Sequence, residues 1–219
     1  MIRLLLADVM PLADTAAYQR LHDRSSPERR MAADSFKFIK DRRLSLGATA
    51  LIDLGLRPFG LKEREVSYGR GAYGKPYFIN APHIHFNISH SSTKVAVAFS
   101  DMEVGCDIEA ITDMDMSVAE RFFCSEEYLA ILTPDNPYGR NQAFFRYWTL
   151  KESYMKATGL GLSLPPESFS VHNGCSAVGD RLPDSGFVLK SLDTFAGYEC
   201  AVCYRPEAGI PEVETVILR

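Results

Sequence analysis

Hydrophobic and polar positions follow a helical period in some stretches of the chain and a strand period in others, and the two kinds of stretch recur in the same order. A short apolar run at residues 2–8 predicts a β-strand. Two stretches with helical spacing follow, at about residues 12–23 and 26–55. Ser26 followed by Pro27 is typical of a helix start, with the serine as cap and the proline in the first turn.

Further strands are predicted after these helices. Three glycines and a proline mark a loop at residues 69–76. Apolar runs at residues 84–88, 95–99 and 104–108 then predict three successive strands. The first half of the chain therefore consists of a strand, helices and further strands, in that order.

The second half repeats this order. Helical spacing recurs at about residues 117–132 and 138–158, and Gly159 is expected to end the second of these helices. Short β segments are predicted after it, at residues 169–172, 187–192, 198–204 and 213–218. We therefore predict an α+β fold with two similar α/β lobes, residues 1–104 and residues 105–219.

Charge and composition narrow the classes of function. The chain has 219 residues and a formal net charge of -4, so we expect no nucleic-acid binding, which needs a strongly basic surface. Asp8 interrupts the apolar run at the start, which is too short for a signal peptide, and no apolar stretch is long enough to span a bilayer. We expect a cytoplasmic protein without membrane contact. Its five cysteines, an odd number without a secretion signal, favour free thiols.

Two carboxylates are the first candidates for chemistry. Asp107 and Glu109 are two residues apart on a predicted strand, so both side chains share one face. Neighbouring carboxylates repel each other unless water or a cation lies between them. Mg2+ is typically bound by one or two carboxylates together with substrate phosphates. The pair therefore indicates either a magnesium site or simply a solvated strand end.

The strongest helix carries a second pair of charges. Glu152 and Lys156 are four residues apart, hence on one helix face. One interpretation is an ordinary surface ion pair. If the helix lies beside the acidic strand, Glu152 instead supplies a third carboxylate for a metal and Lys156 a cation for a phosphate.

Polar residues also gather at a strand end and in a loop. Ser89 and His90 begin a run of donors that suits an anion such as phosphate, although a polar turn is an equally simple interpretation. Gly74, Lys75 and Pro76 form a stiff loop in which the glycine permits close approach of a ligand.

In this order and spacing, the segments resemble the 4′-phosphopantetheinyl transferase family, most closely its surfactin-synthetase-activating type. The resembling pieces are Gly74-Lys-Pro76, Phe86-Asn-Ile-Ser-His-Ser91, Gly105-Cys-Asp-Ile-Glu109, Arg121-Phe-Phe123 and Trp148-Thr-Leu-Lys-Glu-Ser153. Each piece is common alone, but the ordered combination is specific. The resemblance implies a monomer with two lobes in a pseudo-twofold arrangement.

The resemblance also implies roles for individual residues. Asp107, Glu109 and Glu152 look like the family's ligands for Mg2+, with Mn2+ as an alternative. Contacts to coenzyme A are implied for Arg29, Arg43, Gly74, Lys75, Pro76, Ser89, His90, Asp107 and Lys156. Ala32 stands where the family often has a lysine, and Arg30 and Lys40 are the candidates to compensate for it.

The implied reaction moves the phosphopantetheine arm of coenzyme A to a serine of an apo acyl or peptidyl carrier protein and releases 3′,5′-ADP. Glu152 is the first candidate for the base that accepts the serine proton, Glu127 is the second, and Lys156 would stabilise the leaving group. The alternatives are a catalytically silent coenzyme A-binding protein of the same fold and an unrelated Mg2+-dependent hydrolase. The carrier is expected to dock on the segment 111–124, unless Phe122 and Phe123 are simply core.

Overall fold

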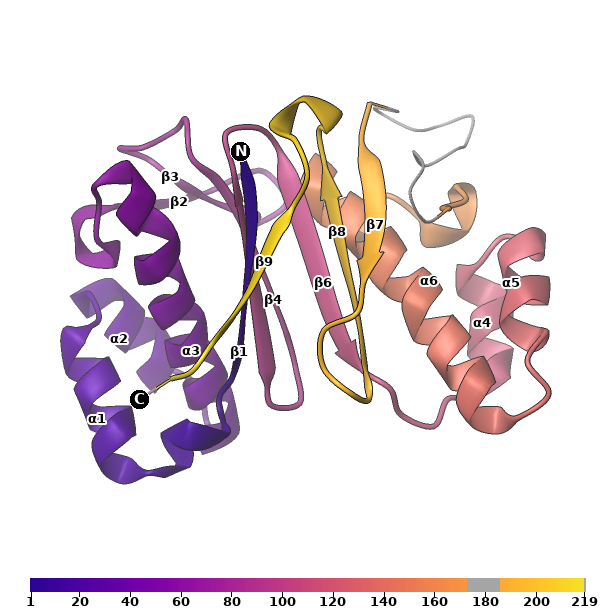
Figure 1. Cartoon of the computed structure of the whole chain (residues 1–219), viewed down its shortest axis with the longest axis horizontal. Coiled ribbons are helices and arrows are strands. Elements are labelled where there is room, and N and C mark those ends of the chain that lie inside the picture. Colours follow the sequence, from indigo (N-terminus) through magenta and orange to yellow (C-terminus); the bar gives the residue numbers. More distant parts are fainter. Residues whose placement is uncertain (173–185, 219) are drawn as a thin grey trace.

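The computed structural model describes residues 1–172 and 186–218. Figure 1 shows two lobes, each with a β-sheet toward the centre of the molecule and helices on the outside. The layers therefore follow the order helices, sheet, sheet, helices.

The first lobe begins with a strand and three helices. These are β1 (Ile2–Asp8), α1 (Thr15–Arg24), α2 (Pro27–Asp34) and α3 (Ile39–Leu56), and the strands that follow are β2 (Tyr68–Arg70), β3 (Pro76–Phe78), β4 (His85–Ser91) and β5 (Lys94–Ser100). The main sheet has the order β4-β5-β1-β9, and β2 pairs with β3 separately. Short 3-10 helices lie at Met10–Ala13, Arg57–Phe59 and Glu63–Glu65.

The second lobe repeats this arrangement. Its elements are β6 (Val104–Ala110), α4 (Met116–Phe122), α5 (Ser125–Leu132), α6 (Pro137–Thr158), β7 (Val188–Leu192) and β8 (Tyr198–Tyr204), with 3-10 helices at Gly161–Ser163, Pro166–Ser168 and Pro206–Ala208. The last strand of the chain, β9 (Glu212–Val216), returns to the sheet of the first lobe. Its sheet has the order β6-β8-β7. In each lobe a strand is followed by helices and then by a hairpin whose second strand pairs antiparallel with the first strand. The predicted α+β fold with two similar lobes is therefore confirmed.

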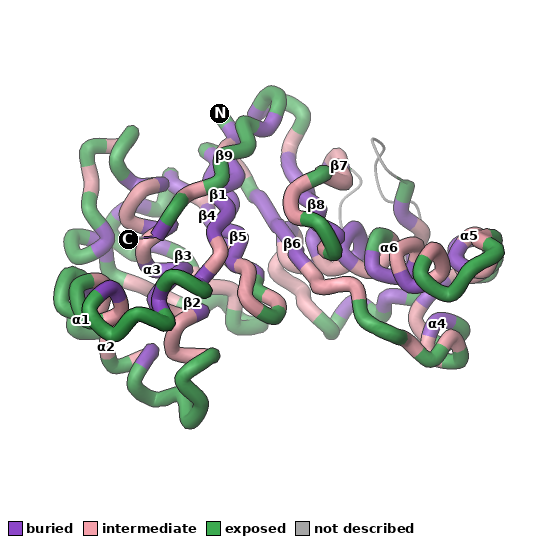
Figure 2. Tube along the Cα trace, turned by 60° about the horizontal axis from the view of Figure 1, so that its bottom comes forward, coloured by how far each residue is buried: buried purple, intermediate pink, exposed green. Residues whose placement is uncertain are grey.

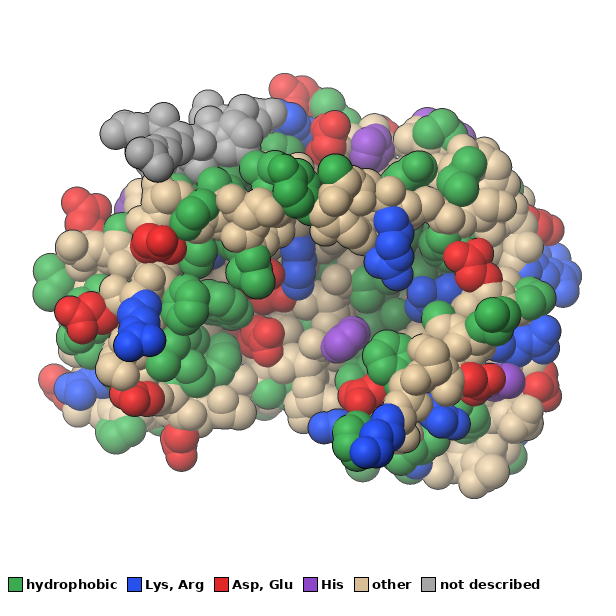
Figure 3. Space-filling model, turned by 180° about the vertical axis from the view of Figure 1, so that it is seen from behind, with side chains coloured by type: hydrophobic (Ala, Val, Ile, Leu, Met, Phe, Trp, Pro, Cys, Tyr) green, Lys and Arg blue, Asp and Glu red, His purple; other side chains and the backbone are tan. Residues whose placement is uncertain are grey.

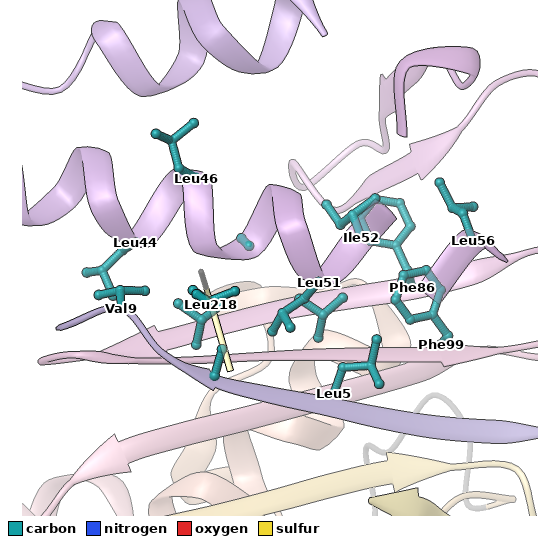
Figure 4. Close-up of a cluster of buried hydrophobic side chains, with 14 of the residues drawn as sticks. Leu5, Val9, Leu44, Leu46, Leu51, Ile52, Leu56, Phe86, Phe99 and Leu218 are labelled. Carbon is teal, nitrogen blue, oxygen red and sulfur yellow. The ribbon is translucent and has the colours of Figure 1, made fainter. Parts of the chain in front are cut away.

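Alternation along the strands sorts the core into layers. On β1, Leu4 and Leu6 face the opposite sheet, whereas Leu5 faces the helices. In the first lobe, Leu51 of α3 points toward the sheet and Leu5 points back at it (Figure 4). Buried residues follow the central strands, and exposed residues cover the outer helices α1 and α2 (Figure 2).

Three predicted boundaries were wrong. The helix expected over residues 26–55 is broken between α2 and α3, and the helix expected over residues 117–132 is broken between α4 and α5. Residues 169–172 were predicted as a strand but form none. The predicted cap at Ser26 is present, since its side chain accepts a hydrogen bond from Arg29 N, and Gly159 ends α6 with a φ of 74°.

The end of the chain lies with the first lobe. Strand β9 pairs in parallel with β1, and Leu218 packs in the core beneath α3. The expected second lobe of residues 105–219 is therefore wrong at its C-terminal end, because the hydrogen bonds of β9 are to the first sheet. Within residues 1–172 and 186–218, no helix combines the length and apolar character needed to cross a membrane.

Candidate active site between the two lobes

A polar cavity lies where the two lobes meet. It has a volume of about 400 Å³ and is lined by Ile88, Ser89, His90, Asp107, Glu109, Trp148, Glu152 and Lys156. The first three residues come from β4 in the first lobe and the others from β6 and α6 in the second. Seen from behind, the molecule is hollowed between the lobes, and acidic, basic and histidine side chains lie in the hollow (Figure 3).

Close packing of β6 on α6 brings the acidic strand to the helix. A Cβ atom added at Gly105 would collide with the backbone of Ser153 and Ala157, so only glycine permits this approach. Asp107 and Glu109 follow on the same face of β6, because their side chains repeat every two residues. The expectation that these acids and the charged face of α6 lie together therefore agrees with the structure.

A hydrogen-bonded network joins both walls of the cavity. Lys156 Nζ lies 2.6 Å from Asp107 Oδ1 and 3.1 Å from Ser89 Oγ. The Ser89 hydroxyl donates to the same Asp107 Oδ1 at 2.6 Å. Asp107 is 1% exposed, and its other oxygen, Oδ2, is buried without a hydrogen-bond partner among the described residues. A buried carboxylate oxygen left unpaired in this way is suited to a cation or a donor on a ligand.

The ionisable groups in the cavity are perturbed by burial. Burial raises the pKa of Glu109 to about 7, against a hydrogen bond with Ser91 that lowers it. Burial also raises the pKa of Glu152 and lowers the pKa of His90. For Lys156, burial lowers the pKa, but the adjacent Asp107 carboxylate outweighs burial and the net shift is upward. Lys156 is therefore held as a cation between acidic groups.

The three expected metal ligands line one cavity but are not assembled around a common point. Among the described residues, no three His, Cys, Asp or Glu side chains are arranged to hold a metal ion. Lys156 Nζ lies among them, 2.6 Å from Asp107 Oδ1 and 3.9 Å from Glu152 Oε2. The unpaired Asp107 Oδ2 and the two neighbouring carboxylates nevertheless fit a hard cation that takes further oxygens from a substrate.

The structure does not bring Glu127 to this cavity, so its expected role as a second candidate base is wrong. Glu127 is 2% exposed on α5 and pairs with Lys151 Nζ at 2.8 Å. Its carboxylate also accepts hydrogen bonds from the backbone N–H groups of Cys124 and Val171. These contacts occupy both oxygens inside the second lobe, where a reacting hydroxyl has no access.

The Gly74–Pro76 loop lines a second, neighbouring cavity. This cavity has a volume of about 500 Å³ and is lined by Lys75, Pro76, His85 and Glu103, among others. Lys75 Nζ donates to the carbonyl oxygens of Val104 and Ala157, at 3.0 and 2.9 Å. Burial lowers the pKa of Lys75 to about 8. Lys75 thus ties the first lobe to the second, and Gly74 adopts the φ of 85° that the turn requires.

The two expected arginines lie on the helices of the first lobe and do not line either cavity. Arg29 donates to Thr49 Oγ1 and to the Ser45 carbonyl, and its guanidinium lies 5.7 Å from the centre of the Tyr68 ring. Arg43 Nε is buried and has no hydrogen-bond partner among the described residues. Arg29 is therefore engaged in packing, whereas Arg43 retains a free donor.

Sequence reasoning left Phe122 and Phe123 open between docking and core, and it gave no role to two residues that line the cavity, Ile88 and Trp148. Trp148 lies one helical turn before Glu152, and this spacing of four residues is the signal that identifies it. Of the aromatic residues considered for docking, Phe123 is core, since it is 4% exposed and packs edge-on against Phe144. Phe122 packs against Trp148 and is half-buried.

The two lobes share a polar cavity whose lysine and glutamates have shifted pKa values, an arrangement typical of the active site of an enzyme. A sequence profile of the 4′-phosphopantetheinyl transferase superfamily matches residues 103–203. The chain is 33% identical to the 4′-phosphopantetheinyl transferase psf-1 of Bacillus pumilus, over 97% of this chain and 94% of that protein.

One further sequence relative and one solved structure are similar to the chain. Identity to the 4′-phosphopantetheinyl transferase Sfp of Bacillus subtilis (strain 168) is 36%, over 81% of each chain. The solved holo-[acyl-carrier-protein] synthase (AcpS) of Thermotoga maritima aligns at a TM-score of 0.37 and 22% identity, over 47% of this chain and 61% of its own. On the strength of the sequence relatives, the chain belongs to the 4′-phosphopantetheinyl transferase superfamily, and the resemblance predicted from the motifs is confirmed.

Proposed function

We propose that this protein transfers the 4′-phosphopantetheine group of coenzyme A to a serine of an apo acyl or peptidyl carrier protein. The observation that carries the proposal is the network of Lys156, Asp107 and Ser89 across a cavity that also holds Glu109 and Glu152. Membership of the superfamily supports the same reaction.

Coenzyme A carries a diphosphate and a separate 3′-phosphate, and the cavity offers partners for both. Lys156 is a cation in a partly dry site, where it interacts with a diphosphate more strongly than it would in water. Ser89 and His90 lie on the opposite wall and are our candidates for the 3′-phosphate end. Arg43, with a free buried donor, is a further candidate for that phosphate.

Asp107, Glu109 and Glu152 are the residues that would hold Mg2+ or Mn2+. Such an ion would neutralise charge on the phosphoryl oxygens during transfer. Both ions prefer oxygen ligands. The cavity offers the unpaired Oδ2 of Asp107 and the carboxylates of Glu109 and Glu152, whose pKa values are raised, and this set supports the assignment.

The reaction forms one bond from the carrier serine oxygen to phosphorus and breaks the bond from phosphorus to the 3′,5′-ADP oxygen. Glu152 is the candidate base for the serine proton, because burial raises its pKa and makes the carboxylate a better acceptor than an exposed one. Lys156 stabilises the negative charge of the departing 3′,5′-ADP. The enzyme's main contribution is positioning and charge stabilisation, as in phosphoryl transfer generally.

The test is the intact mass of an apo carrier protein after incubation with this protein, coenzyme A and Mg2+. We expect a gain of one phosphopantetheine, formation of one 3′,5′-ADP per carrier, and loss of both when EDTA is added. Release of 3′,5′-ADP without a gain in carrier mass would indicate a hydrolase instead.

The second candidate function is a catalytically silent coenzyme A-binding protein. It would show binding of coenzyme A by calorimetry and no mass gain with acyl or peptidyl carriers. The intact set of Asp107, Glu152 and Lys156 in one cavity favours the transferase over this alternative.

A further inference from the structure

In the part of the chain that the structure describes, one edge of β6 has no backbone hydrogen-bond ladder to another strand, although it lies against β4 of the first lobe. The second sheet has the order β6-β8-β7, so β8 pairs with one edge of β6 only. Unpaired backbone groups at a buried sheet edge destabilise a fold unless other groups bond to them.

Side chains of the first lobe bond to this edge at every second residue. Lys75 Nζ donates to Val104 O at 3.0 Å, Cys106 N donates to Asn87 Oδ1 at 2.9 Å, Ile108 N donates to Ser89 Oγ at 3.4 Å, and Ala110 N donates to Ser91 Oγ at 3.1 Å. We call the last three contacts, from Asn87, Ser89 and Ser91, the edge ladder.

The edge ladder has the period of a strand on both sides. Its members advance by two residues along β4 and by two along β6, with a constant separation of 19 residues. The two strands therefore run in the same direction and in a fixed register. A direct backbone ladder would place them about 4.8 Å apart. Because a side chain replaces one backbone partner, the edge ladder holds them farther apart while keeping the register.

This wider spacing is where the cavity lies. One wall carries Ser89 and His90 on β4, and the other carries Asp107 and Glu109 on β6. Asn87 bonds to the residue directly before Asp107, and Ser91 bonds to the residue directly after Glu109. The backbone that presents both acids is thus fixed from the first lobe at each end.

We propose that Asn87 and Ser91 are positioning residues, whose hydrogen bonds to β6 set the separation and register of the two cavity walls for coenzyme A. The inference rests on the proposed function for the identity of the ligand. Neither residue lines the cavity, although Ser91 also bonds to the Glu109 carboxylate, and Asn87 is therefore the cleaner position for a test. Asn87 is 5% exposed, so loss of its side chain leaves the Cys106 N–H buried and unpaired.

Asn87→Ala is the main test, and Cys106→Ala is its matched control. Cys106 is fully buried at the same point of the interface. Cys106→Ala removes the thiol and its weak bond to the Asn87 carbonyl, but keeps the backbone N–H and its bond to the Asn87 side chain. We expect Asn87→Ala to increase the calorimetric Kd for coenzyme A about tenfold, which corresponds to about 1.4 kcal/mol of binding free energy. The variant should also have a higher KM for coenzyme A and a lower kcat. Cys106→Ala should bind within about twofold of wild type.

A merely structural Asn87 would give a different result. Fewer folded molecules would lower the apparent kcat and leave Kd and KM unchanged, and that outcome would overturn the proposal. If Asn87→Ala does not fold, Ser91→Ala is compared with Ser91→Thr, which keeps the hydroxyl. Weaker binding in Ser91→Ala alone supports the edge ladder, whereas equal binding in both contradicts it.

Amide hydrogen exchange tests the edge ladder without coenzyme A. Exchange at Cys106 N–H should be faster in Asn87→Ala than in wild type, and should stay slow in Cys106→Ala. If wild type fails to bind coenzyme A but the three proteins differ in exchange as expected, the proposed function fails and the edge ladder is still supported. Unchanged exchange at Cys106 in Asn87→Ala contradicts the ladder itself.

Discussion

The first strand of each lobe occupies the same place in the topology, but the two strands carry different chemistry. In β1 and β6 alike, alternate residues face the opposite sheet and are apolar, as Leu4 and Cys106 illustrate. The positions between them face the helices. In β1 these positions hold Leu5 and Ala7, which are core residues, whereas in β6 they hold Asp107 and Glu109, which line the cavity.

The difference follows from the neighbours of each strand. Strand β1 lies inside its sheet, with β5 on one side and β9 on the other, so its helix-facing side chains are enclosed and must be apolar. Strand β6 lies at a sheet edge that faces the other lobe, so carboxylates there reach a cavity and can be solvated or paired. Repeating one arrangement twice thus gives a structural strand and a functional strand.

Asp107→Asn is expected to have the largest effect on activity, because it removes one of the two acids that distinguish the helix-facing side of β6 from the apolar Leu5 and Ala7 of β1. Loss of the carboxylate removes the partner of Lys156 and the unpaired oxygen offered to a cation. We expect carrier modification to fall at least about 100-fold, equivalent to about 2.7 kcal/mol of transition-state stabilisation. The measurement is the initial rate of mass gain by the carrier at saturating coenzyme A.

The control for Asp107→Asn is Glu126→Gln, which neutralises an exposed acid on α5. It should keep its activity within about twofold. The proposal for the cavity would be contradicted by an Asp107→Asn protein that retains its fold and wild-type activity.

The largest effect on stability is expected from the buried ion pair between Glu127 and Lys151. Removal of one partner leaves the other charge buried, and we expect Lys151→Met to lower the free energy of unfolding by about 3–5 kcal/mol. The double variant Glu127→Gln with Lys151→Met should recover part of this loss. Denaturant unfolding measures both.

Kinetics separate this structural role from catalysis. If Glu127 only supports the second lobe, folded Glu127→Gln protein keeps wild-type KM for coenzyme A and a kcat within about twofold. A stable Glu127→Gln variant with a kcat reduced about 100-fold or more would restore Glu127 as a base.

The sequence predicted the order of elements because that order depends on local periodicity, and it was weaker wherever distant segments decide the structure. The acidic pair of β6 could be placed on one face from its spacing of two residues. The partner of Glu127 could not be found, since Lys151 reaches it only through the packing of α5 on α6. Pairing of β9 with β1 was equally hidden, because it joins residues more than 200 positions apart.

The same distinction applies to the candidate site. Ser89 and His90 were singled out from their motif, which assigned no role to Asn87 and gave Ser91 only as a further donor for an anion. Their bonds to the β6 backbone depend on how the lobes meet, and no pattern within β4 records the register of β6. The position of Lys156 against Asp107 likewise depends on the close approach that Gly105 permits.

A smaller effect on stability is expected from pH, through Glu109. Its pKa is about 7 in the folded protein and 4.5 in the unfolded chain, so between these values the folded state binds more protons. The contribution to stability is therefore present below pH 4.5 and is lost as pH rises through about 7. Metal-free wild type should lose about 1–2 kcal/mol relative to Glu109→Gln over this interval, after allowance for partial exposure.

This pH dependence is measured by urea unfolding in EDTA at pH 5.0 and pH 7.5. Mg2+ binding requires the ionised carboxylate, so added Mg2+ should reduce the difference at pH 7.5. If the free energy of unfolding changes equally with pH in wild type and in Glu109→Gln, the pKa of Glu109 is not raised. The cavity side of β6 would then accept a charge as readily as an ordinary exposed strand surface.

The smallest effect is expected at β9, the strand that encloses β1. Arg3 and Glu214 form an ion pair across these strands at 2.9 Å, but the side chain of Glu214 is 58% exposed. Solvent screens such a pair, so Glu214→Ala should change the free energy of unfolding by less than about 1 kcal/mol. Leu218→Ala is the informative comparison, because Leu218 is 5% exposed in the core of the first lobe and its truncation should cost about 2–5 kcal/mol. A larger loss of unfolding free energy in Glu214→Ala than in Leu218→Ala would mean that charge, and not burial, holds β9 against β1. Enclosure by β9 would then not explain why Leu5 and Ala7 of β1 are apolar.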